Sequence, residues 1–66
     1  MKFKKGKLYY DERYNEILEY SFKLKNYFIF LEQEENNGVF KVCGNSIIAR
    51  RYYSEKEAQS LIEYKI

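Results

Sequence analysis

Hydrophobic and polar residues alternate regularly in the middle of the chain. Leucine, tyrosine and phenylalanine occupy the even positions from 18 to 24, and polar residues occupy the odd positions from 19 to 25. A period of two places these two sets on opposite faces of a β-strand. Residues 27–31 are apolar at every position, as in a strand buried on both faces. We therefore predict strands over residues 16–24 and 27–34, joined by a tight turn at Lys25–Asn26.

Two glycine-containing pairs predict further hairpins. Asn37–Gly38 is typical of a type I′ turn, in which both central residues have positive φ. This turn would place Glu34 opposite Lys41, which lies on a predicted strand over residues 39–43. Gly44–Asn45 favours a type II′ turn, and a fifth strand would follow over residues 46–52.

The two ends of the chain predict an edge strand and a helix. Residues 3–10 combine lysines with strand-forming residues, and Gly6 would mark a bulge or a bend. Residues 11–15 favour a hairpin loop, with a helix of one or two turns as the alternative. Residues 54–57 read Ser-Glu-Lys-Glu, which is the pattern of a capping box. A helix with a narrow apolar stripe would therefore run over residues 55–64.

Together these elements predict an α+β fold in one small domain, residues 1–66. Its architecture would be an antiparallel β-meander of four to five strands with one C-terminal α-helix packed on one face. Unbroken alternation gives that covered face a largely apolar set of side chains: Leu18, Tyr20, Phe22, Leu24, Tyr27, Ile29, Leu31, Phe40, Val42, Ile47 and Ala49. The opposite, mainly polar face would carry four large apolar side chains: Phe28, Phe30, Ile48 and Tyr52. Either a partner contacts these four, or lysine stems, the N-terminal strand or residues 11–15 cover them.

The residue inventory argues against catalysis. The 66 residues include one cysteine, Cys43, and no histidine, so an intrachain disulfide is excluded and a structural zinc site is disfavoured. The usual general base near neutral pH is also missing, and the three glycines are too far apart to form a phosphate-binding loop. A chain this short has little volume to enclose a substrate. We therefore expect no enzyme activity, no cofactor and no small-molecule substrate.

Aromatic residues and mixed charges instead favour a protein-binding role. The eight tyrosines, five phenylalanines and a net charge of only +2 resemble the composition of protein interfaces. The predicted contact residues are Phe28, Phe30, Ile48, Arg50, Arg51, Tyr52, Lys23 and Lys41. The alternative function is nucleic-acid binding by the basic and aromatic residues of this open sheet face. It is the less favoured one, because three glutamates share that face and would repel phosphates.

Amino-acid composition and the lack of recognisable sorting signals indicate the source of the protein and the compartment in which it acts. Lys, Asn, Tyr, Ile and Phe, all with codons rich in A and T, sum to half of the chain. This composition is typical of an AT-rich genome, such as that of a phage or other mobile element. The partner would then be a host protein, for which the chain acts as an inhibitor or adaptor, for example against a defence system; a homodimer is a further option. A single cysteine, no apolar stretch after the basic start and no membrane-length apolar run predict a cytoplasmic protein without a membrane segment.

Overall fold

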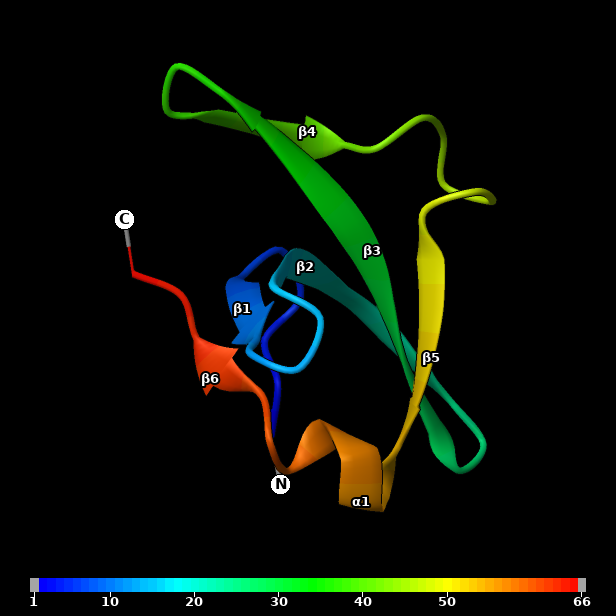
Figure 1. Ribbon diagram of the computed structural model, residues 1–66. Helices are drawn as coiled ribbons and strands as arrows, with labels where there is room; N and C mark the ends of the chain where they lie inside the picture. The colour runs from blue at the N-terminus through cyan, green and yellow to red at the C-terminus, as the bar shows by residue number, and fades with distance from the viewer. Residues whose placement is uncertain (1, 66) are drawn as a thin grey trace.

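The computed structural model describes residues 2–65 as a mainly antiparallel sheet with one short helix (Figure 1). The strands are β1 (Leu8–Asp11), β2 (Glu16–Leu24), β3 (Tyr27–Asn36), β4 (Val39–Val42), β5 (Arg50–Ser54) and β6 (Ile62–Glu63), and helix α1 (Glu55–Ala58) lies between β5 and β6. The order in the sheet is β4-β3-β2-β1-β6, and β5 also pairs with β3. The predicted antiparallel sheet with one helix near the C-terminus is confirmed, although residues 2–65 form six strands and the helix is short.

The tight turns between the central strands follow the predictions. Residues 25–26 connect β2 to β3, with Leu24 opposite Tyr27. Asn37 and Gly38 have φ values of 54° and 81°, as a type I′ turn requires. Residues 12–15, which connect β1 to β2, form the predicted hairpin loop rather than a helix. Local turn chemistry therefore determines how β1 to β4 follow one another.

Strands β4 and β5 lie end to end along the same edge of β3. β4 pairs with residues 33–36 and β5 with residues 27–31. Between them residues 43–49 form a protruding loop, whose two end residues, Cys43 and Ala49, still hydrogen-bond to Glu32 of β3 (Figure 1). Asn45 Oδ1 accepts hydrogen bonds from the amides of Ile47 and Ile48, both at 2.9 Å, and so holds this loop in a helical turn. The predicted type II′ turn at residues 44–45 is therefore wrong, and the predicted fifth strand over 46–52 begins later, at Arg50, and continues to Ser54.

Helix α1 begins as predicted but is much shorter. The Ser54 hydroxyl accepts from the Glu57 amide at 3.3 Å, and the Ser54 amide donates to Glu57 Oε1 at 2.9 Å, which completes the capping box. The Ser60 hydroxyl then donates to the Glu57 carbonyl at 2.9 Å as the chain turns away from the helix. Residues 62–63 pair with the free edge of β1. The predicted helix over 55–64 is wrong beyond its first turn because this edge offers the backbone a second set of hydrogen bonds.

A β-bulge in β2 reverses the predicted alternation of faces. Tyr20 lies opposite Phe30 and Phe22 lies opposite Ile29, so Ser21 has no partner residue on β3. An extra residue on one strand moves the side chains beyond it to the other face. The assignment of all even positions from 18 to 24 to one face is therefore wrong.

The core lies on the face that carries Phe28 and Phe30. Its buried residues are Tyr9, Leu18, Phe28, Phe30, Tyr53 and Ala58. Phe3 covers this cluster, with its ring centroid 5.1 Å from those of both Phe28 and Phe30 in edge-on geometry. Gly6, with φ of 85°, lies in the turn that bends the N-terminal segment back over the core. The alternative in which the N-terminal segment covers these phenylalanines is thus the correct one.

A candidate contact surface on the outer face of the sheet

Three cross-strand rows of side chains form the side of β2, β3 and β5 that is turned away from the core. They are Leu24–Tyr27–Ser54, Phe22–Ile29–Tyr52 and Glu19–Leu31–Arg50. In each row the residue of β3 stands in the middle, between one residue of β2 and one of β5. We call these nine residues the outer face.

Four large apolar side chains of the outer face are exposed together. The exposed fractions are 40% for Phe22, 46% for Leu24, 48% for Tyr27 and 53% for Tyr52, whereas Ile29 between them is fully buried. The rings of Tyr27 and Tyr52 lie 6.4 Å apart in edge-on geometry. Scattered apolar residues are normal on protein surfaces, but neighbouring ones on one sheet face often mark a binding site. The outer face is therefore the candidate contact surface.

Arg50 is the cationic residue of this face, and its hydrogen bonds are incomplete. Its guanidinium carbon lies 5.8 Å from the centroid of the Phe22 ring, within the range of a cation–π contact. Its Nε is buried without a hydrogen-bond partner in the described part of the chain. Arg13 and Arg51, in contrast, both form salt bridges with carboxylates. Arg50 as a whole is only half-buried and forms no salt bridge among the described residues, so its guanidinium is suited to an acceptor from another molecule.

The structure changes the predicted contact set. Phe28 and Phe30 are only 5% and 0% exposed, so the prediction that they form an open face is wrong. Tyr52 and Arg50 do lie on an exposed surface, but on the opposite side of the sheet from these two residues. Three exposed residues of the outer face, Phe22, Leu24 and Tyr27, belong to the set that the alternation predicts for the core, and that prediction is wrong for them. Ser21 fits the polar half of the alternation, so no signal in the sequence marks the bulge that moves them.

The other predicted contact residues do not gather at one place. Lys23 lies over the ring of the core residue Phe28, with Nζ 5.1 Å from the centroid. Lys41 pairs with Glu34 across β3 and β4, as predicted, with Nζ 3.7 Å from Oε1. Ile48 is 67% exposed on the loop over residues 43–49. These residues therefore lie outside the outer face.

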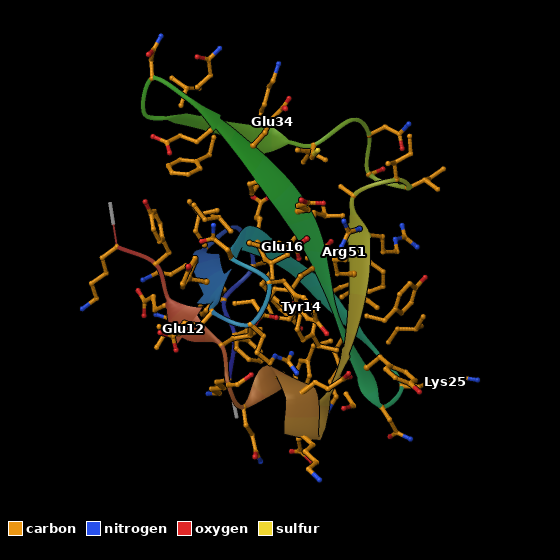
Figure 2. All side chains as sticks on the ribbon, in the orientation of Figure 1. Glu12, Tyr14, Glu16, Lys25, Glu34 and Arg51 are labelled. Atoms are coloured by element: carbon orange, nitrogen blue, oxygen red, sulfur yellow. The ribbon has the colours of Figure 1, made fainter. Side chains whose placement is uncertain are left out.

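Arg51 belongs to a polar hollow at the end of the core. The hollow has a volume of about 280 Å³, and Figure 2 shows Tyr14, Glu16 and Arg51 close together there. Arg51 forms salt bridges with Glu32 and, at 3.8 Å, with Glu16. Burial, together with the nearby charge of Glu32, raises the pKa of Glu16. Both arginines that line the hollow, Arg13 and Arg51, are already paired with carboxylates of the same chain, so the hollow offers no unpaired guanidinium to a ligand.

A buried carboxylate lies next to this hollow. Asp11 is fully buried, and its Oδ2 accepts a 2.7 Å hydrogen bond from the Tyr53 hydroxyl. The Arg13 amide and guanidinium also donate to Asp11, at 3.0 to 3.3 Å. Burial alone would raise the pKa of Asp11, but these hydrogen bonds outweigh it and hold the pKa below its ordinary value of 3.8. The ionised carboxylate is thus fully paired inside the fold.

Within residues 2–65, no group of three or more His, Cys, Asp or Glu side chains could hold a metal ion, and no helix is long and apolar enough to cross a membrane. No protein-family model matches the chain, and no curated protein or solved structure is detectably similar to it. The indications of function therefore come from this chain's own surface and composition.

Proposed function

We propose that the protein is a small non-enzymatic protein-binding module and that the outer face is its contact surface. The observation that carries this proposal is the joint exposure of Phe22, Leu24, Tyr27 and Tyr52 beside Arg50. Tyrosine, other aromatic residues and arginine are enriched where protein interfaces gain most of their binding energy. A partner that covered these side chains would remove their apolar surface from water and bring an acceptor to Arg50.

The role that suits such a module is that of an inhibitor or adaptor. A single domain of this size acts by occupying part of a larger protein's surface, and it needs no cofactor to do so. The composition of the chain supports a phage or mobile element as its source and a host protein in the cytoplasm as its target. A second copy of the chain is the other protein that the same face could contact.

Nucleic-acid binding is the second candidate function, and one observation favours it. Phe22, Tyr27 and Tyr52 expose aromatic rings on one sheet face beside Arg50, an arrangement that can stack single-stranded bases. Glu19 lies on the same face and would repel phosphates. Protein binding is therefore the function that the geometry supports better.

Two paired double variants test the proposal. Phe22→Ser with Tyr52→Ser removes two exposed rings from the outer face, whereas Tyr14→Ser with Val39→Ser removes two apolar side chains elsewhere that are even more exposed, at 65% and 64%. Circular dichroism and urea unfolding should show that both variants stay folded. Tagged protein is then used to capture partners from a host lysate. We expect the first variant to lose the proteins that the wild type and the second variant retain.

Two results would contradict the proposal. One is capture of the same proteins by both double variants and the wild type. The other is binding of a labelled single-stranded oligonucleotide that weakens steeply with added salt and is lost in the variant of Phe22 and Tyr52. The second result would assign the outer face to nucleic acid.

A further inference from the structure

We propose that two copies of the chain pack through their outer faces and that Glu19 of each copy pairs with Arg50 of the other. This inference rests on the proposed function, because it names a second copy as the occupant of the same contact surface. It follows from the way in which charged and apolar side chains are distributed across the three rows.

The outer face is complementary to itself under one rotation. A two-fold axis that lies in the interface and runs along β3 exchanges the β2 side of the face with the β5 side. In the row Glu19–Leu31–Arg50 this rotation brings Glu19 of each copy opposite Arg50 of the other. Residues of β3, such as Leu31, meet their own counterparts on the axis. Two sheets can pack face to face in this way about 10 Å apart, with a modest angle between their strands.

The apolar rows match under the same rotation. Phe22 of one copy comes opposite Tyr52 of the other, so each dimer would contain two equivalent contacts between these exposed rings. In the next row Leu24 comes opposite Ser54, and Tyr27 meets its counterpart on the axis. The rotation therefore places no large apolar side chain against a charge of the facing copy.

The charges of Glu19 and Arg50 are not used within one chain. Among the described residues neither side chain takes part in a salt bridge, and Arg50 Nε is buried without an acceptor. Lys41, in contrast, has Glu34 as its partner in the same chain. The two-fold arrangement gives both unused charges an opposite charge, twice in each dimer.

The size of the outer face predicts a weak dimer. Strands about 4.8 Å apart and rows about 6.8 Å apart give nine residues a footprint of about 15 by 20 Å. This footprint is on the order of 300 Å², well below the roughly 800 Å² per partner of a standard stable interface. Monomer and dimer should therefore exchange reversibly, and the dimer should become populated at high micromolar concentrations.

Charge reversal tests the pairing. We expect sedimentation equilibrium to show an average mass that rises from the monomer toward the dimer between about 10 μM and about 1 mM. Arg50→Glu or Glu19→Arg alone places like charges opposite each other twice and should weaken the dimer at least tenfold. The double variant restores opposite charges and should recover most of the wild-type association. Lys5→Glu, an exposed charge reversal outside the outer face, is the control and should leave association unchanged.

A measurement on the wild type avoids any dependence on how the variants fold. In an equal mixture of isotope-labelled and unlabelled protein, NMR contacts between the two kinds of chain should connect Phe22 to Tyr52. A wild type that is still monomeric at about 1 mM, the highest concentration of the sedimentation series, would overturn the inference. A dimer that lacks these contacts would overturn it too, and so would a failure of the variant that combines Glu19→Arg with Arg50→Glu to recover association.

Failure of this inference can be told apart from failure of the proposed function. If the wild type is monomeric but the variant of Phe22 and Tyr52 still loses captured proteins, the second copy is the wrong occupant and the contact surface stands. If the wild type is monomeric and that variant captures the same proteins, both proposals are overturned.

Discussion

Replacing Tyr53 by phenylalanine would remove one hydrogen bond from the core and leave the aromatic ring in place. The Tyr53 hydroxyl donates to Oδ2 of the fully buried Asp11 at 2.7 Å. In the Tyr53→Phe variant this carboxylate would keep only its bonds from Arg13, whose side chain is 44% exposed. Water cannot readily replace the lost donor because Asp11 has no exposed surface.

The expected loss of stability can be worked out from this geometry. Hydrogen bonds to charged groups contribute roughly 1.5–3 kcal/mol, so the variant should lose about 2 kcal/mol of unfolding free energy. A domain of this length is expected to have roughly 3–10 kcal/mol in total, which makes the loss a large fraction. With a urea dependence of about 1 kcal/mol per molar for a small domain, the unfolding midpoint should fall by about 2 M. Tyr52→Phe is the matched control, because the Tyr52 hydroxyl makes no hydrogen bond within residues 2–65 and its side chain is 53% exposed.

The same pair predicts how the effect depends on pH. Folding lowers the pKa of Asp11 below 3.8, because the hydrogen bonds from Tyr53 and Arg13 outweigh the effect of burial. The ionised carboxylate therefore contributes its full stability above the ordinary pKa, and the contribution is lost as the pH falls through the lower pKa of the folded state. The variant lacks one of these bonds, so its difference from the wild type should be constant near neutral pH and shrink below about pH 4.

Urea unfolding followed by circular dichroism at several pH values from 7 downward checks both parts. Equal midpoints for Tyr53→Phe and Tyr52→Phe at pH 7 would refute the energetic role of the hydrogen bond. A wild-type advantage that stays constant or grows as the solution becomes acidic would refute the assignment of an ionised Asp11.

Two further substitutions test the placement of the core and of the helix cap. Phe30→Ala should cost roughly 3–5 kcal/mol because the ring is fully buried, and thermal unfolding should show a large loss that Phe22→Ala, on the outer face, does not match; equal losses would contradict the assignment of faces. Ser54→Ala should lower the free energy of unfolding by about 1 kcal/mol, measured by urea unfolding. The double variant with Glu57→Ala should lose less than the sum of the two single losses, because both residues form one capping box. Losses that simply add would contradict the reciprocal hydrogen bonds.

Features that depend on a few adjacent residues could be predicted from the sequence. The turn at residues 37–38 requires positive φ at two consecutive positions, which Asn and Gly tolerate better than other residues. The capping box between Ser54 and Glu57 is complete within four residues. The pairing of Glu34 with Lys41 follows directly from the turn that precedes it. In all these cases the decisive interactions lie within one turn.

Features that depend on distant segments could not be predicted in this way. The chain after Ala58 leaves the helical conformation because the edge of β1 is free to pair with residues 62–63. Similarly, β5 pairs with β3 rather than with β4, so the face on which Tyr52 lies is determined by Ile29 and not by the preceding turn. Periodicity reports the preference of one segment, and these outcomes depend on which edge another segment leaves open.

The location of the proposed contact surface depends most strongly on the N-terminal segment. Residues 27–31 are apolar on both faces of β3, so the sequence of the central hairpin alone does not determine which face becomes the core. Phe3 and Ala58 lie on the Phe28 side, and that side is buried. Because of the bulge at Ser21, Leu18 and Tyr20, which precede it, lie on the core face, whereas Phe22 and Leu24, which follow it, lie on the outer face. The exposed side therefore still combines aromatic residues with Arg50, but Phe22 and Tyr27 are residues that unbroken alternation places in the core.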